Sequence, residues 1–451
     1  MKKILTLLLV LLATAPLCAH AQTPALELEA LLRAYADRGD FAGSVLVARH
    51  GKILLEKGYG LANRRTHAPN GPDTRYPIAS VTKTFTAALV LHLAERNKLA
   101  ITDKLSRHYP DFPHGDSITL AQLLSHTSGI YDYTQLNDFM LSETARPATE
   151  QRMLALFRNQ PLDFAPGTDW RYSNSGYSLL GYIIEKATGL RYAQAIQKTI
   201  FTPLGMARSG FDYQRLADAT KAAGYYAEVG KAYVKETPSI DPSISFAAGA
   251  LYSTVGDLYK WHMGLQRHRT MGAASAVRAY TPVRNHYGYG WVIDSVAGQR
   301  TVSHSGGTWG FRSTLVRVPA DDVCIVLLSN TETPSLDAIA KGLLAVLYGQ
   351  PYQLPVTKHA IALAPEMLRP YTGTYLIKEQ DLVVDVKLEN GVLQTYPFHG
   401  PRGELAALSE TRFFIREQEE FEVSFTRDAQ GRVLTMILHA NGRDKVGEKI
   451  K

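Results

Sequence analysis

Strand-like segments lie at both ends of the first 350 residues, and mostly helical patterns lie between them. Residues 44–48 and 53–57 flank His50-Gly51, which predicts a β-hairpin near the start. Four more strand patterns follow the helical stretch of residues 130–280, at 289–296, 301–304, 313–318 and 322–329. A helical pattern over 336–348 closes this part. Strands at both ends with helices between them predict an α/β sandwich that carries a helical insertion.

The apolar pattern changes to a period of two near the end of the chain. Residues 351–365 contain three prolines and are predicted to form a linker. Beyond them, alternating apolar runs are separated by turn signals, at Asn390-Gly391, Gln430-Gly431 and Asn441-Gly442. We therefore expect residues 22–350 to form one domain and residues 366–451 a small antiparallel β-barrel-like domain.

The first 21 residues have the pattern of a secretory signal peptide. Lys2-Lys3 form a charged start, residues 4–12 an apolar core, and Ala19-His20-Ala21 a small-x-small cleavage site. The apolar run is too short to span a bilayer comfortably, so we expect an exported protein, periplasmic or secreted, without a stable membrane anchor. A lipoprotein cut before Cys18 is an alternative, although Leu17 is a bulky neighbour for such a site.

Composition and charge exclude several classes of function. The formal charge falls from +7 to +5 once Lys2 and Lys3 are removed, and no runs of basic residues occur, so we expect no nucleic-acid partner. The second cysteine, Cys324, lies in the apolar run 323–328, so we expect neither a disulfide nor a catalytic cysteine. The histidines are scattered, so we expect no metal and no cofactor.

An extended pattern changes to a helical one at Ser80. Residues 75–77 end at a proline, and from Ser80 onward apolar residues recur every fourth position. Lys83 lies one turn further along the same helix face, which places an amine beside a hydroxyl. Burial and the helix N-terminus both disfavour the ammonium form, so such a lysine can activate the serine. By itself, Ser-x-x-Lys also fits a serine N-cap followed by a solvated lysine.

A second candidate stretch is Tyr172-Ser173-Asn174, in a predicted loop before the helix from Tyr177. A phenol beside a nucleophile can act as a general base if cations such as Lys83 lower its pKa. Asn174 could donate to a substrate carbonyl and orient Lys83. The stretch alone also fits a loop tyrosine followed by an Asx turn.

A third candidate stretch is His304-Ser305-Gly306-Gly307, which ends a predicted strand and opens into glycines. Glycines let the backbone approach a ligand closely. The N–H groups of Gly307 and Ser80 are the candidate oxyanion donors. Taken alone, the pattern fits a polar strand end with a flexible turn better than a binding site. His126, in the turn within Leu-Leu-Ser-His-Thr-Ser-Gly, is predicted to have a structural role by bonding backbone.

The ordered set Ser80-x-x-Lys83, Leu-Leu-Ser-His-Thr-Ser-Gly, Tyr172-x-Asn174 and His304-x-Gly306 resembles the serine β-lactamase and penicillin-binding-protein family. Within that family the chain is similar to class C β-lactamases, D-alanyl-D-alanine carboxypeptidases, D-aminopeptidases and family VIII esterases. The resemblance covers residues 25–350. It implies an antiparallel sheet flanked by helices with a helical subdomain, and a substrate that is a small peptide, an ester or derived from the cell wall.

The resemblance also implies roles for the residues. Ser80 would be the nucleophile of an acyl-enzyme, Lys83 and Tyr172 its proton-transfer partners, and Asn174 a contact to both substrate and lysine. Residues 304–307 would form the strand edge along which substrate lies. Which of Lys83 and Tyr172 is the working base stays open.

One position departs from the family pattern. β-Lactamases and carboxypeptidases usually have lysine where this chain has His304, and that lysine holds a substrate carboxylate. A neutral histidine holds a carboxylate less well, although His304 could be charged at mildly acid pH. This favours a peptidase or esterase over the alternative of a true β-lactamase. The C-terminal module, which resembles the lipocalin-like domains of some D-aminopeptidase-like members, points the same way. A non-catalytic cell-wall or peptide-binding module is the alternative from another class.

Overall fold

The computed structural model describes residues 24–228, 231–238, 240–332, 336–355, 358–378, 382–397, 402–416, 418–440 and 443–451. The predicted signal peptide and the turn signal Asn441-Gly442 lie outside the described residues. None of the helices within these ranges is long and apolar enough to cross a membrane.

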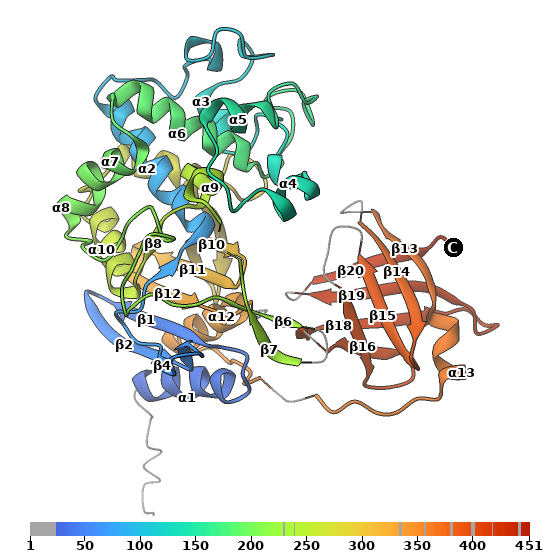
Figure 1. The fold of residues 1–451 in the computed structure, drawn as a ribbon. Helices are drawn as coiled ribbons and strands as arrows, with labels where there is room; N and C mark the ends of the chain where they lie inside the picture. Colours follow the sequence, from blue (N-terminus) through green and yellow to red (C-terminus); the bar gives the residue numbers. More distant parts are fainter. Residues whose placement is uncertain are drawn as a thin grey trace, which may run out of the picture.

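Within the described residues, six strands form one antiparallel sheet in the order β2-β1-β12-β11-β10-β9 (Figure 1). The strands are β1 (Gly43–Arg49), β2 (Lys52–Tyr59), β9 (Val292–Val296), β10 (Gln299–Thr308), β11 (Phe311–Val318) and β12 (Val323–Ser329). The early hairpin joins the later strands where β1 pairs with β12, with Gly43 opposite Ser329. All seven residues of β12 are buried, because helices cover both of its faces. The predicted α/β class, with an antiparallel sheet and a helical subdomain, is confirmed.

Helices pack on both faces of this sheet. On one face, α1 (Pro24–Asp37) and α12 (Leu336–Leu347) bury leucines and isoleucine against the strands. The other face carries α2 (Thr82–Glu95) and α10 (Val255–Gln266). The remaining helices of this part are α3 (Leu120–Leu124), α4 (Asn137–Ser142), α5 (Glu150–Ala155), α6 (Asn174–Thr188), α7 (Tyr192–Ile196), α8 (Thr202–Leu204), α9 (Pro242–Gly249) and α11 (Ala273–Ala279). Short 3₁₀ or π turns occur at η1 (Ala79–Val81), η2 (Leu105–Arg107), η3 (Tyr133–Gln135), η4 (Gln197–Phe201) and η5 (Pro319–Asp321).

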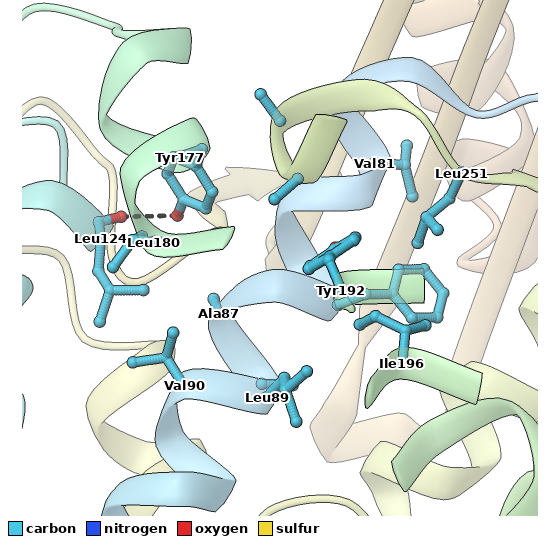
Figure 2. Close-up of a cluster of buried hydrophobic side chains, with 14 of the residues drawn as sticks. Val81, Ala87, Leu89, Val90, Leu124, Tyr177, Leu180, Tyr192, Ile196 and Leu251 are labelled. Carbon is cyan, nitrogen blue, oxygen red and sulfur yellow. Dashed lines mark hydrogen bonds between the residues drawn. The ribbon is translucent and has the colours of Figure 1, made fainter. Parts of the chain in front are cut away.

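Helix α2 is the centre of the larger core. Eleven of its fourteen residues are buried, because α6, α7 and α9 surround it and Trp261 of α10 stacks on Phe85. Figure 2 shows the packing of Val81, Leu89 and Val90 with side chains from the neighbouring helices, and the hydrogen bond from the Tyr177 hydroxyl to the Leu124 carbonyl oxygen. Because almost the whole circumference of α2 is enclosed, the helix is held rigidly together with the turn directly before it, which carries the candidate nucleophile.

Short strands complete this part of the chain. They are β3 (Leu61–Asn63), β4 (Ala68–Pro69), β5 (Tyr76–Pro77), β6 (Tyr225–Glu228), β7 (Lys231–Glu236) and β8 (Tyr252–Ser253). The pairing of β5 with β8 places Tyr76 opposite Ser253 and fixes the segment that leads into Ser80. The β6–β7 hairpin lies inside residues 130–280, which the sequence pattern described as helices and loops, so this hairpin was missed.

Eight strands of the described C-terminal residues close into a barrel (Figure 1). They are β13 (Gly373–Ile377), β14 (Leu382–Glu389), β15 (Val392–Pro397), β16 (Gly403–Ala407), β17 (Arg412–Ile415), β18 (Gln418–Arg427), β19 (Val433–Ala440) and β20 (Arg443–Lys449), preceded by α13 (Pro365–Leu368) and η6 (Arg369–Tyr371). Pairing of Tyr375 with Lys449 closes the barrel. Asn390 and Gly391 both have positive φ between β14 and β15, as a two-residue hairpin turn requires. The predicted C-terminal β-barrel is confirmed.

Candidate active site

Ser80 lies in the turn η1, directly before α2. The predicted helix begins two residues later than its pattern indicated, because a 3₁₀ turn precedes it. Ala79 has φ +44°, a conformation that residues with a Cβ rarely adopt, and the Ile78 amide is anchored to the Leu251 carbonyl 2.9 Å away. A strained residue next to a half-buried serine is typical of a functional turn.

Lys83 is fully buried, and its Nζ contacts three oxygens. Nζ lies 3.1 Å from Ser80 Oγ, 2.8 Å from Asn174 Oδ1 and 2.8 Å from the Ala248 carbonyl oxygen. Burial lowers the pKa of Lys83 from 10.5 to about 7, and the Asp132 carboxylate opposes part of this shift. A neutral amine has two hydrogens, which the amide and carbonyl oxygens accept, so its lone pair is directed at Ser80. The geometry therefore suits Lys83 to take the serine proton.

Tyr172 lies beside both the serine and the lysine. Its ring centroid is 4.7 Å from Lys83 Nζ, and the Ser80 side chain is near enough to affect the pKa of the phenol. The expectation that cations lower the pKa of this phenol is not met: burial is the larger effect and raises the pKa, while the nearby Ser80 side chain lowers it less. The phenol therefore stays protonated near neutral pH, which suits it to relay a proton rather than to act as the resting base.

Asn174 is the first residue of α6 and not a loop residue, because Ser173 caps that helix by accepting the Gly176 amide. Its amide oxygen accepts from Lys83, and its Nδ2 donates to Asp132 Oδ2 over 3.0 Å. Asp132 is a buried carboxylate held by Thr134, and burial raises its pKa. Asp132 was not among the residues predicted from the sequence. The signal was its place six residues after His126, in a polar turn, but nothing local separates such an aspartate from an ordinary helix cap.

His304 is held by two hydrogen bonds. Its Nδ1 lies 2.6 Å from the Ser305 carbonyl oxygen and its Nε2 2.9 Å from the Tyr287 hydroxyl. Since a carbonyl only accepts, Nδ1 carries the proton and Nε2 accepts from the tyrosine. Burial and the nearby Lys83 lower the pKa of His304 to about 3. The expectation that His304 becomes charged at mildly acid pH is therefore wrong.

Gly306 and Gly307 lie within β10 rather than after it, because the strand continues to Thr308. A Cβ on Gly306 would lie 2.5 Å from the Ile78 carbonyl oxygen and 2.8 Å from the Ser80 nitrogen, so only glycine lets β10 approach η1 this closely. The pairing of β9 with β10 ends at Ser303. Residues 304–307 thus run past Ser80 beyond the end of β9, which suits a substrate-binding strand edge.

His126 has the structural contacts that its turn predicted. Its Nδ1 accepts the Ser173 amide over 3.1 Å, and its ring lies 4.3 Å from the ring of Tyr172. Burial, Lys83 and His304 keep its pKa well below the ordinary value, so it is neutral. His126 therefore positions the segment that carries Tyr172 and Asn174 without adding charge.

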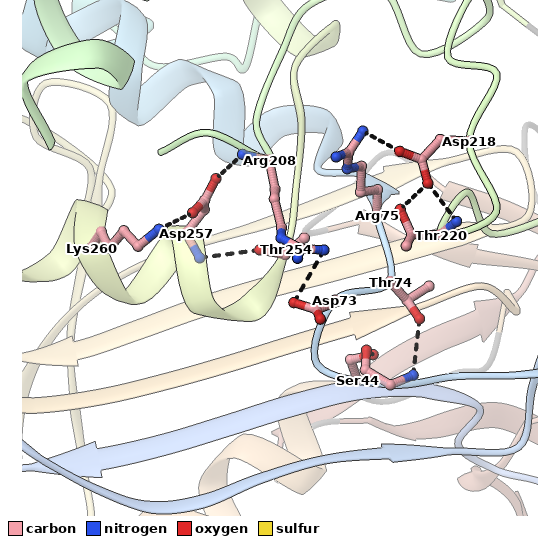
Figure 3. A network of polar contacts seen from close by, with 11 residues as sticks. Ser44, Asp73, Thr74, Arg75, Arg208, Asp218, Thr220, Thr254, Asp257 and Lys260 are labelled. Atoms are coloured by element: carbon pink, nitrogen blue, oxygen red, sulfur yellow. Dashed lines mark hydrogen bonds and ion pairs between the residues drawn. The ribbon is translucent and has the colours of Figure 1, made fainter. Parts of the chain in front are cut away.

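A pocket of about 170 Å³ is lined by segments that neighbour these residues, although none of the seven predicted site residues lines it. Its lining includes Pro77, Gly249 and Thr308, which lie close in sequence to Ser80, to the Ala248 carbonyl that Lys83 contacts, and to Gly307. The loop of residues 211–224 and residues 236–238 and 240–245 supply most of the remaining lining. Figure 3 shows how the loop and the residues before it are fixed: Arg75 pairs with Asp218 over 3.0 Å and Arg208 with Asp73 over 3.2 Å.

The structure thus brings all seven predicted residues to one site, from η1, α2, α6, β10 and the segment before α6. The site therefore has the groups of a serine hydrolase on an α/β fold: a half-buried hydroxyl, a lysine with depressed pKa, a phenol, and an amide beside a strand edge.

The chain belongs to the Beta-lactamase family, whose model matches residues 28–350. Penicillin-binding protein 4* of Bacillus subtilis (strain 168) is 32% identical over 450 residues, which cover 94% of this chain and 98% of that protein. The octameric penicillin-binding protein homologue from Pyrococcus abyssi superposes with a TM-score of 0.68 at 24% identity, covering 94% of this chain and 100% of that chain. A D-stereospecific amidohydrolase from Streptomyces sp. superposes with a TM-score of 0.63 at 25% identity, covering 73% and 100%. The protein is accordingly a serine hydrolase of the β-lactamase fold, related to penicillin-binding proteins and D-amino acid amidases.

Proposed function

We propose that the protein is exported and hydrolyses amide or ester bonds of small peptides or esters through an acyl-enzyme on Ser80. The observation that carries this proposal is the arrangement of the Lys83 amine, with two fixed oxygen acceptors and a lone pair directed at the Ser80 hydroxyl. A pKa of about 7 leaves a large neutral fraction at physiological pH.

In acylation, Ser80 Oγ attacks the substrate carbonyl carbon while its proton passes to Lys83 Nζ. The N–H groups of Ser80 and Gly307 would hold the negative charge on the carbonyl oxygen. Tyr172, protonated and close to Ser80, would relay a proton to the leaving nitrogen or oxygen as the bond to carbon breaks. Water then attacks the acyl carbon and gives up a proton to Lys83 Nζ, as Ser80 did before it. The bond to Ser80 Oγ breaks, the proton returns to Ser80, and the acid is released.

The state of His304 argues for a particular substrate class. Its Nδ1–H is used by the Ser305 carbonyl, its Nε2 accepts from Tyr287, and the ring is neutral. It therefore offers neither charge nor a free N–H to a substrate carboxylate. We infer that amides and esters without a carboxylate on the leaving group are preferred, as in an aminopeptidase, amidase or esterase. D-Ala carboxypeptidase and true β-lactamase activities, whose substrates carry that carboxylate, should be weaker.

A turnover screen tests the proposal. Purified protein is offered nitrocefin, D-Ala-D-Ala peptides, D-amino-acid amides and p-nitrophenyl esters. We expect turnover of amides or esters, covalent labelling of Ser80 by a fluorophosphonate, and loss of both in Ser80→Ala. Ser295→Ala, an exposed serine on β9, is the matched control and should keep full activity.

Two outcomes would contradict the proposal. Hydrolysis that survives Ser80→Ala would show that the reaction does not pass through an acyl-enzyme on Ser80. Peptide or cell-wall binding without turnover, unaffected by replacing Ser80, Lys83 and Tyr172, would instead identify a binding module. Sequencing the N-terminus of secreted protein tests export, and a mature start at Gln22 is expected.

A further inference from the structure

The positive charge of the chain is concentrated in one segment. Residues 258–320 contain eight lysines and arginines and a single acidic residue, Asp294, which gives +7, equal to the formal charge of the whole chain. Lys260 pairs with Asp257, and Arg312 lies near Glu332. In the described part of the chain, the other six form no ion pair with a carboxylate: Arg267, Arg269, Arg278, Arg284, Arg300 and Arg317.

Two of these six arginines line one cavity. The cavity has a volume of about 420 Å³ and lies between the end of α10, helix α11 and the first part of β10 and β11. Arg300, Arg317 and His268 are its basic lining residues, and its lining includes no aspartate or glutamate. The rest of the wall is mainly apolar, with Leu265 and Val277 among it, and Val277 is 67% exposed.

Arg317 is buried and fixed by neutral acceptors. Its Nε donates to His262 Nδ1 over 3.0 Å, its Nη1 to the Tyr280 hydroxyl over 2.6 Å and its Nη2 to Gln266 Oε1 over 3.2 Å. His262 is neutral, because burial and the guanidinium lower its pKa to about 4, and its other nitrogen contacts Asp322. The imidazole ring of His262 thus separates the Arg317 guanidinium from the Asp322 carboxylate. Two of the five guanidinium N–H groups of Arg317 have no assigned acceptor.

Arg300 approaches the same cavity from the exposed side. Its Nη2 donates to the Tyr280 carbonyl oxygen over 2.6 Å, so both guanidinium groups are anchored on one residue. The two cations bond opposite ends of Tyr280, its backbone carbonyl and its phenol, and both line the cavity, so an anion inside it would be attracted by both. Arg300 precedes Gly306 by six residues on β10, a separation of roughly 20 Å along an extended strand. The cavity is therefore separate from the Ser80 site.

We propose that this cavity binds a phosphate group, held by Arg300 and facing the fixed charge of Arg317. Arginine suits phosphate because its planar fork donates two parallel hydrogen bonds, and two guanidinium groups match a dianion. The apolar wall and the exposed Val277 leave room for an organic body next to the phosphate. That chemistry has two sources, a soluble phosphate compound or the headgroup of an anionic phospholipid.

The test uses the full-length secreted chain and two matched variants. Arg300→Gln removes the exposed cavity cation, and Arg284→Gln removes an exposed, unpaired cation of the same segment that does not line the cavity. Inorganic phosphate and glycerol phosphate are titrated calorimetrically. Flotation with phosphatidylglycerol vesicles measures binding to an anionic phospholipid headgroup, and phosphatidylcholine vesicles are the control. Thermal melting without phosphate confirms that both variants fold.

We expect Arg300→Gln to weaken the binding roughly tenfold, as the loss of a charge-assisted hydrogen bond predicts, with little effect from Arg284→Gln. Loss confined to the soluble phosphates supports a soluble ligand, and loss confined to phosphatidylglycerol vesicles supports a lipid headgroup. The proposal is overturned if neither phosphate nor vesicles bind. It is also overturned if both variants lose binding equally, because a diffuse basic surface would then explain the attraction.

Discussion

The protonation state of Lys83 should set the lower pH limit of activity. Burial brings its pKa from 10.5 to about 7, which corresponds to roughly 5 kcal/mol of penalty on the ammonium form. Only the neutral amine can accept the Ser80 proton, so activity is present above the folded pKa and is lost as the pH falls through it. The neutral fraction is about nine-tenths one unit above this pKa and about one-tenth one unit below it. We therefore expect kcat/KM to fall about tenfold for each unit below pH 7.

The assay is kcat/KM for a p-nitrophenyl ester or amide across about pH 5 to pH 9, with the ester's spontaneous hydrolysis subtracted. Lys83→Arg is the control, because a guanidinium stays charged at every pH in this range and the variant should be inactive throughout. Activity that is still rising steeply at the upper end of this pH range, or a profile without any limb, would refute the assignment of Lys83 as base. Activity of Lys83→Arg close to that of the unmodified protein would refute it as well.

Three further changes test neighbouring parts of the structure. Asp132→Asn removes the carboxylate that favours the Lys83 ammonium, so the acid limb of the pH profile should move to lower pH; an upward move would contradict this. Gly306→Ala forces a Cβ to 2.8 Å from the Ser80 nitrogen and should lower kcat/KM about a hundredfold with a small change in Tm, whereas normal turnover would show that β10 is free to move. Phe85→Ala removes a buried ring and should lower the free energy of unfolding in urea by about 3–5 kcal/mol; a loss below about 1 kcal/mol would mean that the core around α2 refills the space.

Local patterns were sufficient for most of the secondary structure. The hairpin of β1 and β2, the helix α12 and the turn at Asn390-Gly391 follow from residue periodicity and turn chemistry, which act over a few neighbours. The β6–β7 hairpin could not be predicted from local patterns, because its stability depends on contacts with distant residues. The Tyr225 amide, for example, donates to the Asn330 carbonyl oxygen, more than a hundred residues away. The length of β10 was underestimated for a similar reason: glycines weaken a strand pattern, but pairing with β11 extends it to Thr308.

By itself, the sequence determined which groups exist and in what order: a hydroxyl and an amine one helical turn apart, a phenol with an amide two residues on, and a histidine before two glycines. Their ionisation was decided only by the tertiary structure, because a pKa depends on the burial and charge that distant segments supply. Enclosure by the surrounding helices makes Lys83 a base near pH 7 and keeps Tyr172 protonated. Tyr287 and the Ser305 carbonyl fix His304 as a neutral ring. Asp132 became part of the site in the same way, since only the approach of α6 places Asn174 between it and Lys83.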